Sequence, residues 1–176
     1  MEDTKLAAAI ARKDDEAARR LVDEHFDGIY RFLKQLCRSS EEAQDLAQQT
    51  LIRVVRNAGR YDGRAPLRSW IYAIAYREFG RWRRRRLWLP LSTQIESEDN
   101  VAARVTDGAL LAEALMKLRT EHRAVFLMHY VEGFSIEEIA VVQRTKPGTV
   151  KSRLHFARRY LKSMLEQEEF YVAEPT

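Results

Sequence analysis

The sequence has few of the residues that staple or interrupt a fold: it contains one cysteine, four prolines and seven glycines in 176 residues. A single cysteine, Cys37, excludes an internal disulfide and indicates a reducing compartment, and its place on an apolar helix face predicts burial. No apolar run is long enough to cross a membrane, and no signal segment is present. We therefore expect a cytoplasmic protein without a membrane partner.

Patterns that carry metal binding or catalysis are also missing. The four histidines have no metal-ligand spacing with one another or with Cys37. Neither a phosphate-binding loop nor a glycine-rich nucleotide fingerprint is present. We therefore expect no metal, no cofactor and no enzymatic activity.

Charge of one sign is missing from parts of the chain. Residues 144–162 hold seven lysines or arginines and no acid, and residues 60–86 hold nine arginines against Asp62 and Glu78. The stretch between them, 87–143, holds nine acids and four bases. Two basic blocks separated by an acidic one suggest two contact surfaces for a polyanion.

Strand signals are almost absent, and apolar residues recur at helical spacing along most of the chain. Helices are expected at about 5–12, 14–37, 40–57, 67–86, 108–118, 121–132 and 136–143, with a last one that begins near Pro147. Residues 87–107 lose this periodicity and have the composition of a flexible linker. The sequence therefore predicts an all-α fold with two small helical domains, 1–86 and 108–176, joined by that linker.

The segment SIEEIAVVQRTKPGTVKSRLHFARRYL predicts a helix-turn-helix, because a short helix, a three-residue turn and a longer helix follow one another. Ser135 and Glu138 have capping-box spacing at its start. The acid-free face of the second helix suits a major groove, although a solvated basic face is the alternative. The residues expected at DNA are Gly148 and Thr149 at the helix start, Lys151, Ser152 and His155 at base edges, and Arg153, Arg158 and Arg159 at phosphates.

A second nucleic-acid surface is predicted in RSWIYAIAYREFGRWRRRR. Tyr72 and Tyr76 lie four residues apart, and we expect them on the outer face of their helix beside Arg77, Arg83 and Arg84. Aromatic side chains beside arginines are typical of proteins that hold the unstacked bases of a single strand. The alternative is a solvated face whose basic tail binds nucleic acid without selectivity. Glu78 lies within the apolar stripe of the same helix, where a salt bridge would explain it.

Four motifs in this order resemble the extracytoplasmic-function group of bacterial sigma factors, the promoter-specificity subunits of RNA polymerase. EEAQDLAQQTLIRVV and APLRSWIYAIA lie in residues 16–86, which resemble the first conserved domain of that family. EGFSIEEIA and GTVKSRLHFARRYL lie in residues 108–165, which resemble the second. The resemblance covers nearly the whole chain and implies a sigma factor that binds core RNA polymerase and directs promoter-specific transcription initiation.

The resemblance also implies a role for each part of the chain. The helix-turn-helix would bind the −35 promoter element as duplex DNA, and the helix at 67–86 with the loop before it would recognise and melt the −10 element as a single strand. The −10-binding residues so implied are Arg64, Tyr72, Tyr76, Arg77, Arg83 and Arg84. The helix at 41–57 would dock on the clamp helices of the largest polymerase subunit through Gln44, Asp45, Gln48, Gln49 and Ile52. The linker would thread through the polymerase.

Several positions depart from the family pattern. Arg77 and Arg81 stand where the family usually has Asn and Asp, and Lys146 and Pro147 replace a usual Ser-Val before the recognition helix. Gln44 and Gln49 stand where the docking helix usually carries acids.

The missing acids suggest a regulatory hypothesis at Thr50. A phosphate there would add about −1.5 to −2 charges, which is close to the two charges missing at Gln44 and Gln49, so a Ser/Thr kinase would activate the protein. The alternative is that Thr50 is an ordinary helix residue, half-buried against the preceding helix. An anti-sigma factor is a further expected regulator.

Two other functions compete with this interpretation. A helix-turn-helix regulator that is not a polymerase subunit would need a receiver or ligand domain with alternating strands, and residues 1–86 show none. A basic RNA-binding module would leave the helix-turn-helix unexplained.

Alanine substitutions on the second helix of the helix-turn-helix separate base reading from phosphate binding. We expect Lys151→Ala and His155→Ala to change which −35 sequences are used, each at a cost of about 1–3 kcal/mol, because base-edge contacts carry the sequence information. Arg158→Ala should weaken binding to all sequences alike. Transcription across a promoter library measures both effects, and identical sequence profiles for the three variants would contradict these roles.

Overall fold

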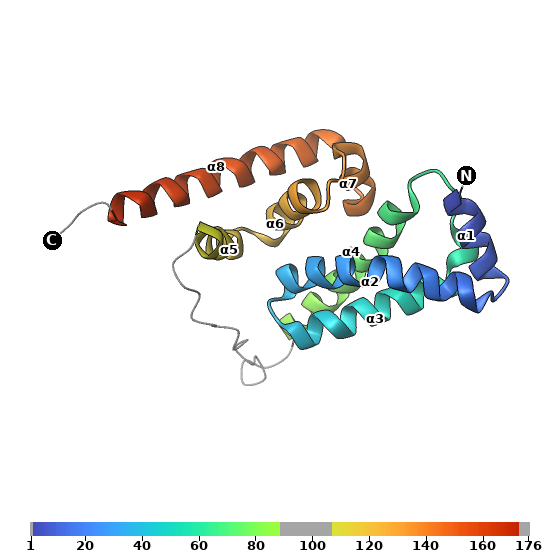
Figure 1. Cartoon of the computed structure of the whole chain (residues 1–176). Coiled ribbons are helices and arrows are strands. Elements are labelled where there is room, and N and C mark those ends of the chain that lie inside the picture. Colours follow the sequence, from blue (N-terminus) through green and yellow to red (C-terminus); the bar gives the residue numbers. More distant parts are fainter. Residues whose placement is uncertain (1, 89–106, 173–176) are drawn as a thin grey trace.

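The computed structural model describes residues 2–88 and 107–172, and all regular elements within these ranges are helical, which confirms the all-α prediction (Figure 1). The expected linker, 87–107, lies almost wholly outside the described residues. The first bundle comprises α1 (Glu2–Ala11), α2 (Asp15–Cys37), α3 (Ser40–Arg56), the 3₁₀ turn η1 (Ala58–Arg60) and α4 (Leu67–Trp88). The second comprises α5 (Asp107–Lys117), α6 (Thr120–Phe126), the π-helical turn η3 (Leu127–Val131), α7 (Ile136–Gln143) and α8 (Pro147–Val172).

Side-chain caps fix several helix starts where the sequence places them. Asp14 caps α2 by accepting a hydrogen bond from the Ala17 N–H at 3.1 Å. The capping box of α7 is complete, since Ser135 and Glu138 each bond the backbone N–H of the other, at 3.1 and 2.8 Å. The Ser39 hydroxyl accepts from the Glu42 N–H at the start of α3, at 3.3 Å.

The start of α1 differs from the prediction. The helix begins at Glu2 rather than near residue 5. In its first turn, the Asp3 carboxylate accepts a hydrogen bond from the Leu67 N–H at 2.9 Å. The N–H groups at a helix start have no partner within the helix, so Asp3 satisfies one of them for α4. This contact joins α1, the first helix of the bundle, to the start of α4, the last.

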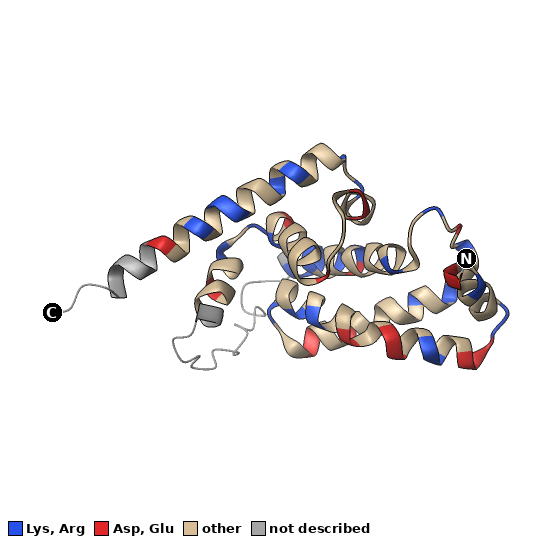
Figure 2. Ribbon diagram, turned by 45° about the horizontal axis from the view of Figure 1, so that its top comes forward, with Lys and Arg blue, Asp and Glu red and all other residues tan. Residues whose placement is uncertain are grey.

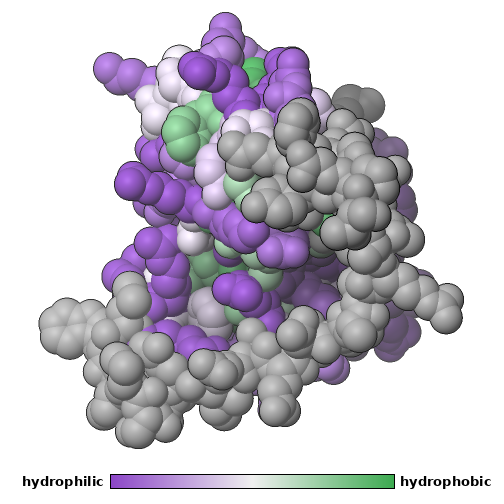
Figure 3. All heavy atoms as spheres, turned by 90° about the vertical axis from the view of Figure 1, so that its left-hand side faces the viewer, coloured by the Kyte–Doolittle hydropathy of each residue, from purple (hydrophilic) through white to green (hydrophobic). Residues whose placement is uncertain are grey.

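The two bundles pack on one another and share one hydrophobic core. Helix α4 lies against α2 and α3 on one side and against α7 on the other (Figure 1). The Tyr72 ring of α4 contacts Phe32 of α2 and Phe134, which precedes α7, at centroid distances of 5.3 and 4.9 Å. On the face drawn in Figure 3, hydrophilic side chains cover most of the described surface and apolar ones form only small patches.

A buried arginine joins the bundles at a second place. Arg123 of α6 donates to the Leu36 carbonyl at 2.9 Å, near the end of α2, and to the Met116 carbonyl at 3.2 Å. A cation is favourable beside the carbonyl end of a helix, where the helix dipole is negative. Cys37, one residue further, is buried as predicted and donates its thiol to the Ser39 carbonyl at 3.3 Å.

Replacing Arg123 tests this capping contact. We expect Arg123→Met to lower the free energy of unfolding by about 1–3 kcal/mol, because the Leu36 and Met116 carbonyls lose a buried donor. Arg119→Met, at an exposed position four residues earlier, is the matched control and should change stability little. Urea unfolding measures the difference, and equal stability of the two variants would show that Arg123 does not contribute.

Candidate nucleic-acid and protein interfaces

The helix-turn-helix is formed as predicted. Helix α7 ends at Arg144, whose left-handed backbone (φ 51°) turns the chain toward α8. Val150 and Leu154 of α8 are buried, as are Ile139 and Ala140 of α7. Basic residues recur along α8 (Figure 2). The predicted DNA contacts that are exposed on the described structure are Gly148, Lys151, Ser152, His155, Arg158 and Arg159, whereas Thr149 is half-buried.

The structure corrects the expected role of Arg153. Its guanidinium is half-buried and donates to the Gln143 side-chain oxygen at 2.7 Å. Gln143 in turn donates to the Glu121 carbonyl at 3.4 Å. Arg153 therefore fixes α8 against α7 and α6 and does not point outward toward a phosphate.

The expected docking face lies on the outer side of α3. All five of its residues are exposed: Gln44, Asp45, Gln48, Gln49 and Ile52. An open groove of about 430 Å³ adjoins it between α2 and α3, and its apolar lining comprises Val22, Phe26, Leu51, Ile52 and Val55. Ile52 is 50% exposed at the edge of this groove. A surface that combines exposed polar groups with an apolar groove suits a protein partner.

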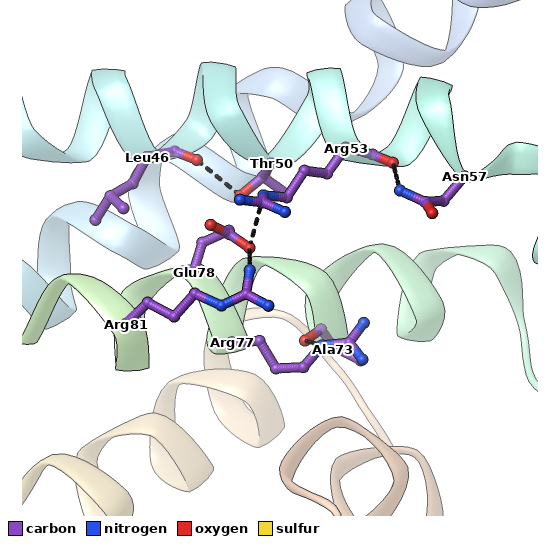
Figure 4. Close-up of polar contacts among 8 residues, drawn as sticks. All are labelled: Leu46, Thr50, Arg53, Asn57, Ala73, Arg77, Glu78 and Arg81. Carbon is purple, nitrogen blue, oxygen red and sulfur yellow. Dashed lines mark hydrogen bonds and ion pairs between the residues drawn. The ribbon is translucent and has the colours of Figure 1, made fainter. Parts of the chain in front are cut away.

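The kinase hypothesis requires an exposed Thr50 hydroxyl, and the hydroxyl is buried. Its side chain is 0% exposed, and its hydroxyl donates to the Leu46 carbonyl at 2.7 Å (Figure 4). One residue along a helix is a rotation of about 100°, which carries Thr50 from the face of Gln49 into the core beside α4. A kinase has no access to it here, so Thr50 is a buried structural residue.

The expected exposure of Tyr72 is wrong. Its side chain is 1% exposed, and its hydroxyl donates to the Glu132 carboxylate at 2.7 Å. Burial raises the pKa of the Tyr72 phenol, and Glu132 adds to the shift. The reason is that α4 is packed on several sides, so residues 71–75 are all buried. Apolar residues around the whole circumference of a helix are the sequence signal for this.

The other residues expected at the −10 element are partly covered. Tyr76 and Arg77 are half-buried, and Arg77 donates to the Ala73 carbonyl at 3.0 Å. Arg83 pairs with Glu121 of α6 at 3.1 Å. Only Arg64 and Arg84 of the six are exposed, because the second bundle lies over this side of α4.

Sequence reasoning missed the polar contacts that hold this side of α4. Arg68 donates to the Glu132 carboxylate at 2.7 Å and to the Glu132 carbonyl at 2.6 Å. Its guanidinium lies 4.5 Å from the centroid of the Phe134 ring, and the Ser69 hydroxyl donates to Glu138 at 3.1 Å. We call Arg68, Ser69, Tyr72, Glu132 and Glu138 the α4 junction. Its partners are at least 60 residues apart in sequence, so local spacing gives no sign of it.

Glu78 is explained by the salt bridge that the sequence suggested. Its buried carboxylate contacts Arg53 of α3 at 2.9 Å and also Arg81, one turn further along α4 (Figure 4). Arg81 departs from the family pattern, and Glu78 is an acid within an apolar stripe. These two unusual residues of α4 are therefore partners in one salt bridge. The pair of arginines compensates the burial of the carboxylate and ties α3 to α4.

Two kinds of feature are absent from the described residues: a membrane-spanning helix and a metal-binding cluster. Within 2–88 and 107–172, no helix is long and apolar enough to cross a membrane. In the same ranges, no group of three or more His, Cys, Asp or Glu side chains is arranged to hold a metal ion.

Comparison with known proteins places both bundles in one family. The models Sigma-70 region 2 and Sigma-70, region 4 match residues 21–89 and 109–161. The chain is 32% identical over 157 residues to the ECF RNA polymerase sigma factor SigL of Mycobacterium tuberculosis, covering 85% of this chain and 89% of that protein. It is 26% identical over 173 residues to ECF RNA polymerase sigma factor SigW of Bacillus subtilis, covering 89% and 92%.

Solved structures share the fold. CnrH in complex with the cytosolic domain of CnrY matches with a TM-score of 0.74 and 23% identity, over 95% of this chain and 99% of that chain. The sigma factor RpoE in complex with the anti-sigma factor NepR from Bartonella quintana matches with a TM-score of 0.69 and 23% identity, over 84% and 96%.

Two substitutions at Thr50 distinguish a structural residue from a phosphosite. We expect Thr50→Val to change the free energy of unfolding by about 1 kcal/mol or less, because the Leu46 carbonyl keeps its helical hydrogen bond. Thr50→Glu should be strongly destabilising, because it buries an unpaired charge. Thermal unfolding and polymerase binding measure both, and a well-folded Thr50→Glu variant that binds polymerase more tightly would restore the kinase hypothesis.

Proposed function

Because this chain belongs to the extracytoplasmic-function group of RNA polymerase sigma factors, which direct promoter-specific transcription initiation, we propose that separate faces of its two bundles contact the polymerase and the promoter. The observation that carries this division is that the outer faces of α3 and α8 are exposed at the same time, on different bundles. Action on core polymerase implies a cytoplasmic location and no catalysis by the chain itself.

The α3 face is the proposed site for the clamp helices of the largest polymerase subunit. Asp45 is its only acid, so we infer that docking depends mainly on hydrogen bonds from Gln44, Gln48 and Gln49 and on burial of Ile52 in the adjoining groove. Hydrogen bonds between neutral groups and apolar burial are less sensitive to salt than ion pairs. Docking through this face should therefore persist at moderate ionic strength.

The α8 face is the proposed site for the −35 element. Lys151, Ser152 and His155 are exposed near the start of the helix, where side chains of a recognition helix reach base edges. Arg158 and Arg159 follow one turn later, where contact with phosphates would fix the position of the helix on the duplex. Residues 108–176 would form this DNA-binding domain, with residues 87–107 as the linker.

Recognition of the −10 element requires the two bundles to separate. Arg64 and Arg84 are accessible in the closed arrangement, but Tyr76, Arg77 and Arg83 become available to a single strand only when the second bundle leaves α4. Tyr72 remains a core residue in this proposal, because it also packs on Phe32 within the first bundle. We infer that the closed arrangement belongs to the free chain and that an open one binds the melted promoter.

An anti-sigma factor is the proposed regulator in preference to a kinase. The solved neighbour RpoE is bound to the anti-sigma factor NepR. The exposed groove between α2 and α3 gives such a protein a surface that overlaps the polymerase site, whereas Thr50 is buried.

Co-elution with core polymerase, followed by run-off transcription, tests the proposed function. The unmodified chain should bind core polymerase in a one-to-one complex that initiates at specific promoters. Ile52→Glu should weaken the complex at least about tenfold, because it places a charge in an apolar contact. Val141→Glu, at a residue of matched 49% exposure on α7, should leave it intact. A chain that activates transcription without binding core polymerase would instead be a conventional regulator.

Removal of the Glu132 carboxylate tests the need for opening. We expect Glu132→Ala to raise the affinity of the free chain for a single-stranded −10 oligonucleotide at least about tenfold, because loss of a buried charged partner destabilises the closed form. Glu137→Ala, at an exposed position of α7, is the control and should bind as the unsubstituted chain does. Fluorescence anisotropy gives both affinities, and equal values for the two variants would contradict a closed form that hides the −10 face.

A further inference from the structure

Among residues 147–166 of α8, whose side chains the structure describes, the outward face contains one large, strongly exposed apolar side chain among its polar and basic ones. Phe156 is 49% exposed, and it is not part of the core that Leu154, Ala157 and Leu161 form on the other side of the helix. It lies next to His155 and one turn after Ser152, two of the residues proposed to read bases. A phenylalanine at this place is unusual for a helix face that otherwise carries cations.

The Phe156 ring packs against one ring on α6 and another on α8. The His122 ring of α6 stacks on it, with the centroids 4.5 Å apart and the planes inclined by 29°. Tyr160, one turn further along α8, has its ring centroid 6.3 Å from that of Phe156. Burial lowers the pKa of His122, and the charge of Arg153 lowers it further, which favours the neutral imidazole in this stack. A ring fixed before binding loses little conformational entropy when it meets a ligand.

The surface around the ring is an open groove along α8. Its lining includes Lys151, Ser152, His155, Phe156, Arg159 and Tyr160, which follow one another at helical spacing on one strip of the surface. Donors for base edges and a cation for a phosphate therefore border a fixed apolar ring. In the major groove, thymine alone among the four bases presents a methyl group, at C5, and apolar side chains distinguish it by contact with that methyl.

We propose that Phe156 determines −35 specificity by packing its ring on the C5-methyl group of a thymine. The inference rests on the proposed function, since it requires α8 to lie in the major groove of the −35 element. Phe156 would add an apolar contact to the polar readout by Lys151 and His155. The −35 sequence that this chain prefers should then contain at least one thymine that is discriminated from cytosine by its methyl group.

Uracil substitution tests this contact with minimal change to the DNA. Transcription of a promoter library by the polymerase complex first identifies the preferred −35 sequence. Each thymine in that duplex is then replaced by uracil, which lacks only the methyl group, and binding of the complex is measured. At one position we expect affinity to fall about three- to fivefold, as loss of one buried methyl group predicts. Placing 5-methylcytosine where cytosine was disfavoured should recover part of the preference.

Substitutions at Phe156 test whether its ring causes the difference in affinity between thymine and uracil duplexes. In Phe156→Ser, thymine and uracil duplexes should bind equally, whereas Phe156→Leu keeps apolar bulk and should retain part of the difference. Val141→Ser, at a side chain of equal 49% exposure on α7, is the matched control and should keep the full difference. Transcription from a promoter with a consensus −35 element confirms that each variant is folded.

The outcomes separate the two proposals. Sequence-specific −35 binding with no uracil effect at any thymine would overturn the role of Phe156 and leave the sigma function in place. A Phe156→Ser variant that binds polymerase more weakly but keeps its DNA selectivity would also overturn the role of Phe156 and leave the sigma function in place. The residue would then belong to a protein contact. Absence of any −35 preference in the polymerase complex would remove both proposals.

Discussion

The carboxylate of Glu132 is the group on which the arrangement of the two bundles depends. Its side chain is 7% exposed, and it accepts hydrogen bonds from Arg68 and from Tyr72, both on α4. An unpaired buried carboxylate costs several kcal/mol, so Arg68 and Tyr72 are what allow Glu132 to be buried where the second bundle lies on α4. Gly28 completes the site, because a Cβ there would approach the Tyr72 hydroxyl to 2.9 Å and displace it. This contact joins the second bundle to α4, beside the residues proposed for the −10 element.

The polar α4 junction suits an interface between the two bundles that opens and closes. When the bundles separate, Glu132 and Arg68 regain water, and this hydration offsets much of what their pairing contributed. The Arg83–Glu121 pair, whose side chains are already 43% and 40% exposed, contributes little to closure. The apolar contact of Tyr72 with Phe134 and the cap that Arg123 places on α2 add to the closed state. The outer faces of α3 and α8 are exposed in the closed arrangement, so under the proposed function either the polymerase or the −35 duplex can bind before the bundles separate.

The sequence predicts the local features of this protein well. Helical periodicity and capping residues give the all-α fold, the start of α2 at Asp14 and the capping box of α7. Such features depend on residues a few positions apart, whose interactions are fixed by the geometry of a single helix. The exposure of the outer faces of α3 and α8 follows from the same periodicity.

The errors concern contacts between helices. Periodicity identifies an apolar face but does not say how many neighbours a helix has, so Tyr72 was expected outside although α4 is covered on several sides. The exposure of Thr50 that a kinase needs and the outward direction expected of Arg153 are both absent for a related reason, since the direction of each side chain depends on the packing of a neighbouring helix. Arg68 and Glu132 are 64 residues apart, and no local pattern relates them.

The distance between the two bundles, measured with and without polymerase, tests most directly whether the closed chain opens to act. Spin labels on cysteines introduced at Asp23 of α2 and Lys162 of α8, in a Cys37→Ala background, report that distance. We expect one short distance in the free chain and a longer one in the complex with core polymerase and promoter DNA. The same distance in both states, or a free chain that is already extended, would contradict a closed form held by Glu132.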